Sequence, residues 1–564
     1  MPQSYSPVYF PQDWSPISMS AANQVTDSCT DDASSNIGNY ATWNPLDQQY
    51  SGFTYAEGNK RISTGTSSGG QTTSTIAVGS GRYYAEVLIN SWATSNGVGI
   101  AKPGQPNNGS VNVHLQNVIV GKIYNNGVEN QTGLTTLSAT NVVGIDLDID
   151  GGTVQFYLNN STYGSAESLT AGEGYAIFAQ SGGNSADLTL RTEPADWSYA
   201  AKGTGVPFCT ANLPAPTVTN SSDHFTVKTL VNGSSPNTSF DTGLASVGLI
   251  MAKRTDGAGG WEWFDIARGA NALLQSNNND DEVTKSGFSF SGGTFNFDNT
   301  ANLGQANTSH VVFSWLAGGS PSSDEGGAIT SNVSAAGHGG FSVGTYSGTG
   351  SASTVGHGLS RAPSWVIVKM RSGSGTQTWT VWQEDIFNAA NADYIILSSS
   401  AAKTNGASFS STAPTSSAFS VGNDATNQSG STFCFWAFAK TPGLIASGSY
   451  TGNGSSDGPM IVVDDGGSGF KPAWLMIKRT NNTDDWKVSN SVMSPFNPVL
   501  TNSNLNINTA AAVDTPSGPI DYLANGFKPR LANGPWNASG DNYIYLAFAE
   551  NPFGGDTVAQ ARAR

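Results

Sequence analysis

The sequence predicts an all-β protein of several domains, and three observations lead to this fold class. The chain has 564 residues with 67 Gly, only 12% charged residues and 10% aromatic residues. Few charges combined with many aromatics and turn formers are typical of an all-β chain with many loops, because disordered chains are poor in aromatics. Short runs of alternating polar and apolar residues, separated by Asn-Gly, Asp-Gly and Gly-Gly, predict antiparallel strands.

Bulk charge and cysteine usage exclude several classes of function. A net charge of -16 argues against nucleic acid as a partner, because no basic stripe is present to contact phosphates. Cys29, Cys209 and Cys434 lie far apart and show no ligand spacing, so neither disulfides nor a zinc site is expected. The start "MPQSYSPVYFPQDWSP" lacks the pattern of a signal peptide, and no segment approaches the roughly 18 apolar residues of a membrane span. We therefore expect cytosolic synthesis and no membrane insertion.

Residues 1–60 form the first region and are expected to be irregular. Prolines alternate with aromatic residues there without any period, which suits an arm lying across a partner protein. The alternative is a strap that packs on the chain's own first domain. Both interpretations stay open.

Residues 61–215 are expected to form a β-sandwich. In "GRYYAEVLI", Tyr84, Glu86 and Leu88 share one face and Tyr83, Ala85, Val87 and Ile89 the other, which predicts a half-buried strand. Further short strands follow at close intervals, including "NGVGIAKPG", "NVVGIDLDID", "TVQFYLNN" and "GYAIFAQ". Regularly spaced strands of this kind indicate a sandwich rather than a parallel sheet.

The order of these segments resembles the SPRY (B30.2) family. The resemblance is carried by "GRYYAEVLI", "GVGIA", "VVGIDLDIDGGTVQFYLNN" and "LTLRTEPADWSY". The flanking segments "DSCTDDASSNIGNYATWNPLD" and "VPFCTANLPAPTV" resemble those of SPRY domains in bacteriophage tail proteins. The resemblance covers roughly residues 25–215 and implies a sandwich in a virion protein.

The rest of the chain contains a threefold internal repeat. Each copy has a β run ending in Lys253, Lys369 or Lys478, then a polar turn, then a strand through Trp261, Trp379 or Trp486. The spacing of roughly 110 residues suits independent small domains in tandem better than a solenoid. We predict a divergent first module at 216–320, a Gly/Ser-rich linker at 321–340, and modules at 341–442 and 443–564. These modules resemble a repeated domain of unassigned chemistry in phage tail and fibre proteins.

Three alternating aspartates and a glycine, Asp146, Asp148, Asp150 and Gly151, match the first half of a calcium loop. The match fails at the twelfth position, where Tyr157 stands in place of a bidentate Glu. With a period of two, the aspartates are the solvent-facing half of a hairpin closed by "DGGT". No metal is expected.

Candidates for catalysis are few. Glu262 and Asp265 beside Trp261 and Trp263 are the acid pair to inspect for glycan cleavage, although a solvated hairpin rim is the favoured interpretation. "GTSSG", Gly65 to Gly69, matches a nucleophile-elbow string without its strand-to-helix context, which indicates chance. We assign no catalytic residue and no cofactor.

Histidine and tryptophan positions favour structural roles. None of His114, His224, His310, His338 and His357 is paired at metal spacing, and a structural hydrogen bond is expected of His357. The recurrent Trp261, Trp379 and Trp486 are expected to pack in a core rather than form a glycan platform, whereas Trp536 is expected to be exposed. The sequence does not identify receptor-binding residues.

These expectations combine into a virion protein, most consistent with a tail fibre or receptor-binding appendage that attaches non-covalently to the bacterial surface. Its partners would be other virion proteins, through the arm, and a surface glycan or outer-membrane receptor. Multivalent loop contacts would supply avidity, and such appendages are usually homotrimers. The alternatives are a capsid fibre or decoration protein and, less favoured, a glycan-depolymerising tailspike.

Overall fold

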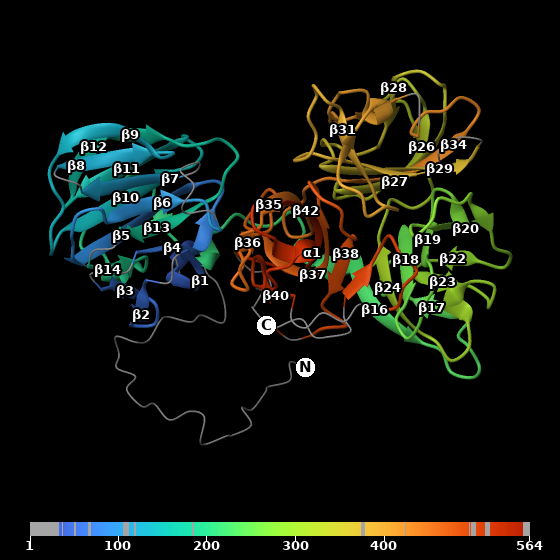
Figure 1. Ribbon diagram of the computed structural model, residues 1–564, viewed down its shortest axis with the longest axis horizontal. Helices are drawn as coiled ribbons and strands as arrows, with labels where there is room; N and C mark the ends of the chain where they lie inside the picture. The colour runs from blue at the N-terminus through green and yellow to red at the C-terminus, as the bar shows by residue number, and fades with distance from the viewer. Residues whose placement is uncertain are drawn as a thin grey trace. The chain divides into compact units, whose positions relative to one another are not determined.

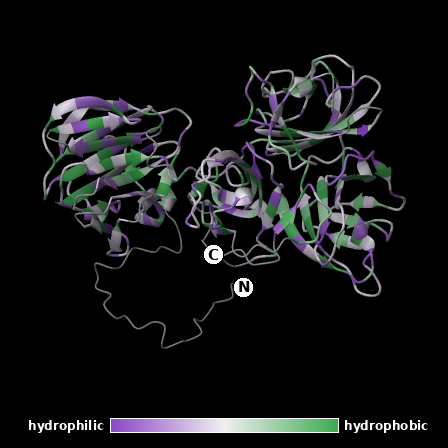
Figure 2. Ribbon diagram, in the orientation of Figure 1, coloured by the Kyte–Doolittle hydropathy of each residue, from purple (hydrophilic) through white to green (hydrophobic). Residues whose placement is uncertain are grey.

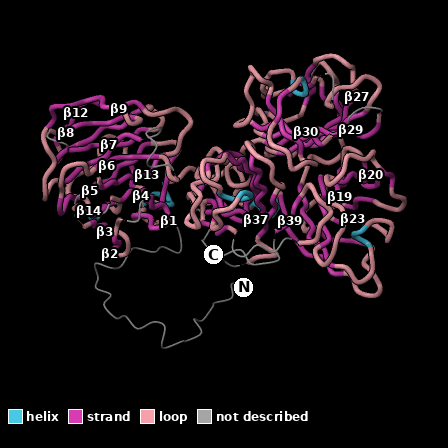
Figure 3. The backbone as a smooth tube through the Cα atoms, in the orientation of Figure 1, coloured by secondary structure: helices cyan, strands magenta, loops and turns pink. Residues whose placement is uncertain are grey.

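The protein is all-β, as predicted, and divides into two compact units, residues 1–212 and 213–564. A computed structural model describes residues 33–35, 38–49, 52–65, 69–104, 112–117, 120–182, 185–373, 378–422, 425–495, 497, 504–513 and 519–555. Strands and loops make up nearly all of both units (Figures 1 and 3). Hydrophobic residues gather on the strands (Figure 2).

The first unit has two antiparallel sheets. One has the order β1-β4-β13-β6-β7-β8-β9, and the other has the order β12-β11-β10-β5-β14-β3-β2, with β15 beside β5. The strands are β1 Trp43–Gln49, β2 Thr54–Ala56, β3 Arg61–Thr64, β4 Gly70–Val78, β5 Arg82–Ser91, β6 Gly97–Ala101, β7 Asn112–Asn117, β8 Gly121–Asn125, β9 Val128–Leu134, β10 Val142–Asp148, β11 Thr153–Leu158, β12 Ser161–Ser168, β13 Tyr175–Ser181, β14 Ala186–Arg191 and β15 Val206–Pro207.

The sandwich begins earlier than the predicted boundary at residue 60. β1 pairs with β4, and β2 pairs with β3, so residues 43–49 and 54–56 belong to the two sheets rather than to an irregular arm. Trp43 is fully buried in β1, which explains why this segment is held by the sandwich. The Pro- and aromatic-rich stretch at residues 1–32 lies outside the described residues.

The predicted aspartate hairpin is confirmed, but one of its aspartates is buried. Asp148 of β10 pairs with Thr153 of β11, and its Oδ1 accepts the Gly151 amide at 2.7 Å to close the turn. Asp146 is only 3% exposed, contrary to expectation. Tyr84 of β5 is its direct cross-strand neighbour, and Arg82, two residues along the same strand, donates to both of its oxygens, at 2.9 and 2.6 Å. The neighbouring cation is what allows this carboxylate to be buried.

Strand β5 is buried more completely than a half-buried strand would be. Glu86 is fully buried because the segment that follows β14 covers that face. The amides of Ser198 and Tyr199 donate to Glu86 at 2.6 and 2.9 Å, and Trp197 packs edge-on against Tyr84. The "ADWSY" segment is therefore a lid over the sheet.

The second unit contains three modules with the same strand order. Their large sheets run β16-β24-β18-β19-β20-β21, β25-β26-β27-β34-β29-β30-β31-β32 and β35-β42-β37-β38-β39. Each module adds a small sheet, β17-β23-β22, β28-β33 or β36-β41-β40. The predicted threefold repeat is therefore present in the architecture.

Its elements, in chain order, are β16 Phe225–Val231, β17 Ser239–Asp241, β18 Leu249–Arg254, β19 Trp261–Asp265, β20 Gly269–Gln275, β21 Val283–Thr284, β22 Ser289–Ser291, β23 Thr294–Asn296, β24 Ser309–Trp315, β25 Ser322–Asp324, β26 Ser331–Ala335, β27 Phe341–Ser347, β28 Ser353–Gly356, β29 Trp365–Ser372, β30 Trp379–Gln383, β31 Asp393–Ile396, β32 Thr404–Asn405, β33 Ala418–Val421, β34 Thr432–Phe438, β35 Ile445–Thr451, β36 Ile461–Val462, β37 Phe470–Arg479, β38 Lys487–Asn490, β39 Asn504–Asn506, β40 Ile520–Leu523, β41 Gly526–Pro529, α1 Gly534–Asn537 and β42 Asn542–Pro552.

The modules are not independent, because their large sheets share one hydrophobic core. In β18, Ile250 and Ala252 face the module's own core, while Leu249 and Met251 face a cluster that residues of all three modules build. Modules 2 and 3 likewise have a private cluster on the other face of their large sheets. Sheets buried on both faces produce continuous apolar runs, such as "GLIMA" and "WVIV", instead of strict alternation.

The segment expected to be a linker is structured. β25 and β26 pair antiparallel with each other, and β26 pairs with β27, so residues 322–335 extend the large sheet of module 2. Ladder hydrogen bonds come from the backbone, so small polar side chains at an edge do not prevent them. Val333 supplies the apolar contact with the core of module 2.

Replacing Trp379 by Ala tests the sharing of the core. Trp379 is fully buried and its ring lies 5.0 Å from that of Trp263 in module 1. We expect a loss of about 3–5 kcal/mol in the unfolding free energy of the second unit. Native-state hydrogen exchange should show reduced protection in all three modules, whereas Val231→Ala at an exposed position should leave it unchanged. Loss of protection confined to residues 341–442 would contradict a shared core.

Candidate functional site

The recurrent lysine and tryptophan of each module lie side by side at the boundary with another module. Lys253 pairs with Trp261 across β18 and β19, and Lys369 pairs with Trp379 across β29 and β30. Lys478 and Trp486 flank the equivalent pair, Ile477 and Lys487. All six side chains are fully buried. The expected core packing of the tryptophans is therefore confirmed.

Each recurrent indole donates a hydrogen bond to the backbone of a different module. Trp379 Nε1 of module 2 donates to Asn278 O of module 1 at 3.1 Å. Trp486 Nε1 of module 3 donates to Ile396 O of module 2 at 3.0 Å. Trp261 Nε1 of module 1 donates to Asn506 O of module 3 at 2.8 Å, which closes the cycle. The three modules thus form a ring with three equivalent junctions.

The lysines follow the same cycle. Their ammonium groups donate to Asp280 O from Lys369, to Ser400 O from Lys478 and to Ala510 O from Lys253, at 3.0, 3.2 and 3.2 Å. Burial away from water lowers the pKa of each lysine to about 8. These cations satisfy loop carbonyls that the junction would otherwise bury without partners. Each lysine therefore links two modules by a hydrogen bond.

The acid pair singled out from the sequence cannot act as a pair. Glu262 and Asp265 are three residues apart on β19, so their side chains point to opposite faces of the sheet. Both are buried, which makes the interpretation as a solvated rim wrong. Glu262 accepts the amides of Asn302 and Leu303, each at 3.0 Å, and burial raises its pKa to about 7. It anchors a loop within module 1.

Asp265 belongs instead to a charged network at the junction of modules 1 and 2. Arg268 donates to Asp265 at 2.6 Å and to Glu282 at 3.1 Å. Arg371 of module 2 donates to both oxygens of Glu282, at 2.9 and 2.6 Å. The guanidinium of Arg268 also lies over the ring of Trp436, 5.4 Å from its centroid. Sequence reasoning missed this network because its members come from two modules and share no local motif.

The remaining sequence candidates have mixed outcomes. His357 makes the expected structural contacts, with Nε2 3.1 Å from Thr415 O and Nδ1 accepting the Leu359 amide at 3.1 Å. Trp536 is buried, contrary to expectation, because α1 turns its ring into the core of module 3. The serines of "GTSSG" lie outside the described residues. Within the described part of the chain, no group of three or more His, Cys, Asp or Glu could hold a metal ion.

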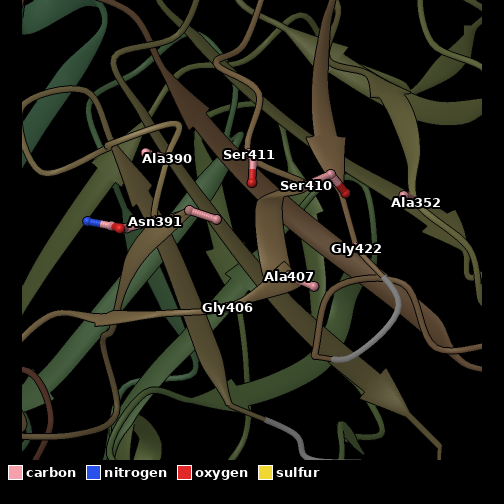
Figure 4. Close-up of a pocket in the computed structure, with 9 residues that line it drawn as sticks. Ala352, Ala390, Asn391, Gly406, Ala407, Ser410, Ser411 and Gly422 are labelled. Carbon is pink, nitrogen blue, oxygen red and sulfur yellow. The ribbon is translucent and has the colours of Figure 1, made fainter.

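A first cavity, of about 490 Å³, opens in module 2 (Figure 4). Its polar side chains are poorly placed for a ligand. The amide of Asn391 is directed away from Ser410 and Ser411. Ser410 Oγ donates a hydrogen bond to Val421 O at 2.7 Å. The other lining residues are small: Ala352, Ala390, Ala392, Gly406, Ala407 and Gly422.

A second cavity, a groove of about 360 Å³, lies along the extended sheet of module 2. Its lining is dominated by hydroxyl, amide and guanidinium groups. The lining residues are Ser323, Ile329, Thr330, Ser331, Asn332, Thr345, Tyr346, Ser347, Arg371 and Thr432. This groove is the better candidate for binding a polar ligand.

Comparisons with known proteins found one family model and several solved structures that are similar to parts of the chain. A family model described as a domain of unknown function (DUF7483) matches residues 220–552, which is the three-module ring. Two similar solved structures are the PSpry domain of TRIM65 and the SPRY domain of human HERC1, each 19% identical. They cover 28% and 26% of this chain and 93% and 96% of their own, with TM-scores of 0.24 and 0.23. No curated protein matches the sequence of this chain.

No helix of the described residues is long and apolar enough to cross a membrane.

The junction lysines predict a pH dependence with a defined sign. Below pH 8 the Lys369 ammonium must be buried with its charge, whereas in the unfolded chain it stays charged up to about pH 10.4. The folded form therefore binds fewer protons between these values, and the contribution of Lys369 to stability should increase as pH rises from about 8. Chemical denaturation of the wild type and Lys369→Met should show a stability difference that moves in favour of the wild type with rising pH. Lys228→Met, at a partly exposed position of β16, is the control, and a difference independent of pH would refute the assignment.

Removing the central carboxylate of the charged network should destabilise one junction. In Glu282→Gln, Arg268 and Arg371 lose the negative charge that they share, and we expect a loss of about 3 kcal/mol in the unfolding free energy of the second unit. Asp256→Asn removes a carboxylate beside the more exposed Arg254 and should have little effect. Equal effects of the two substitutions in urea denaturation would show that burial of the network is unimportant.

Proposed function

The chain belongs to the family described as a domain of unknown function, DUF7483, and because that description assigns no activity, we propose a function from the architecture and the sequence resemblances. The protein is a virion structural protein of a tailed bacteriophage, namely a tail fibre or receptor-binding appendage. It attaches non-covalently to the bacterial surface.

The observation that supports this proposal best is the shared core of the second unit. Three sheets packed on one core, with reciprocal bonds at each junction, make a rigid body that carries three sets of Gly-, Ser- and Asn-rich loops. Rigid scaffolds with variable polar loops suit recognition of external ligands. The sequence resemblance of the first unit and of the modules to phage tail proteins supports the virion context.

Adhesion would be multivalent. Several copies of the chain on one virion would multiply weak contacts with a surface glycan or an outer-membrane receptor. Residues 1–32 would contact other virion proteins. A homotrimer is part of the proposal, and light scattering of the purified chain tests it by asking whether three copies of the 58.5 kDa polypeptide associate.

A capsid fibre or decoration protein is the second candidate, supported by the Pro- and aromatic-rich start, which suits attachment to any virion surface. A glycan-depolymerising tailspike is less favoured, because the acid pair singled out for that chemistry points to opposite faces of β19.

Virion labelling and cell binding test the proposal together. Antibody against the purified chain should mark the tail of the phage by electron microscopy, and the fluorescently labelled chain should bind host cells saturably. Deletion of residues 1–32 should remove the protein from virions but leave its cell binding intact. Label on the capsid would favour the decoration protein, and the absence of label from virions would refute both candidates.

A further inference from the structure

The groove of module 2 exists because this module carries two strands that the other modules lack. The described large sheets of modules 1 and 3 begin at β16 and β35, whereas that of module 2 continues past the equivalent β27 to β26 and β25. The extension builds one side of the groove, and Arg371, at the junction with module 1, also lines it. This is a local departure from the threefold repeat.

Four polar side chains share the face of the sheet that lines the groove. Asn332 of β26 is directly opposite Thr345 of β27, and Ser347 of β27 is directly opposite Thr432 of β34. Thr345 and Ser347 are two residues apart, so they point to the same face. Strand spacing of about 4.8 Å and a two-residue repeat of about 6.8 Å set these groups on a grid comparable in size to a sugar ring.

These groups are free to bind a ligand. Among the described residues, the side chains of Asn332, Thr345 and Ser347 make no hydrogen bond, and Thr432 Oγ1 shares one with Ser372 Oγ at 2.9 Å. Hydroxyl and amide groups both donate and accept hydrogen bonds, which matches the hydroxyls of a carbohydrate. Buried Tyr346 and Ile329 also line the cavity.

The charge of the groove favours a neutral ligand. Among the described residues that line the groove, Arg371 is the one with a formal charge, and its Nε and Nη2 atoms are bound to the carboxylate of Glu282. The ion pair cancels the guanidinium charge and leaves Nη1 as a further donor. An anionic ligand would gain little from a cation that already has a bidentate partner.

We propose that this groove binds a neutral hexose unit of a glycan. The proposal rests on the proposed adhesive function and deepens it by naming the recognition site and the ligand class. Asn332, Thr345, Ser347 and Thr432 contact the sugar hydroxyls, and Glu282 positions Arg371 at one end of the groove.

Ligand-observed NMR with the full chain tests this site. Saturation-transfer difference spectra would be recorded with D-glucose, D-galactose, D-mannose and N-acetyl-D-glucosamine separately, and with D-galacturonic acid as the anionic comparison. At least one neutral sugar should receive saturation. The double variant Asn332→Ala/Thr345→Ala should weaken its binding by at least about tenfold, because two hydrogen bonds are lost.

The matched control is Asn391→Ala/Ser411→Ala at the first cavity, which should bind as the wild type does. Both double variants change exposed or half-exposed residues, and circular dichroism and the unfolding midpoint verify that each remains folded. The proposal is overturned if no neutral sugar binds, if the groove variant binds normally, or if the acid binds in preference to the neutral sugars.

Failure of the site and failure of the adhesive function give different results. If groove variants bind host cells as well as the wild type and no sugar is bound, this site is refuted while adhesion stands. If sugar binding depends on the groove but the chain is absent from virions, the proposed function is refuted while the site stands.

Discussion

The packing of three large sheets on one hydrophobic core is the constraint on which the second unit depends. Each sheet packs on its own module's core with one face and on the common core with the other, so its central strands are buried on both faces. Ring contacts cross every junction, between Trp263 and Trp379, Trp365 and Trp486, and Phe225 and Phe548. A module removed from the ring would expose this entire face.

The apolar junctions also contain buried polar groups, and these groups distinguish one junction from the others. The position held by Asp265 in module 1 is Gln383 in module 2 and Asn490 in module 3, as their cross-strand partners show. All three accept backbone amides of the turn that follows. Only Asp265 adds a charge and recruits Arg268, so the ionic network marks one junction and distinguishes it from the other two. Buried charges are costly unless paired. Asp265 is paired with Arg268, which also bonds Glu282, and Glu282 in turn accepts from Arg371 of module 2.

The residues that repeat in all three modules hold the ring together, whereas the groove lies where module 2 departs from the repeat. The repeated lysines and tryptophans are fully buried in contacts between modules, so they cannot contact a ligand. The groove arises where β25 and β26 break the repeat. The added edge pairs with β27 through its backbone and packs Val333 on the core of module 2, while the side chain of Asn332 stays exposed. This division explains why the recurrent residues, although prominent in the sequence, are poor guides to binding.

Local pattern by itself determined the all-β class, the aspartate hairpin, the threefold repeat and the burial of the recurrent tryptophans, because strand periodicity and turn residues act over a few neighbours. The sequence could not show that Lys253, Lys369 and Lys478 clamp a ring, that Glu262 and Asp265 point to opposite sides of a doubly buried sheet, or that Asp146 and Trp536 are buried. Those outcomes depend on residues from distant segments. The Gly- and Ser-rich stretch that was predicted to be a linker contains strands β25 and β26. Backbone pairing requires a neighbouring strand edge from elsewhere in the chain rather than a particular side chain. Only the tertiary structure decided which modules meet, and therefore which polar groups remain free to bind.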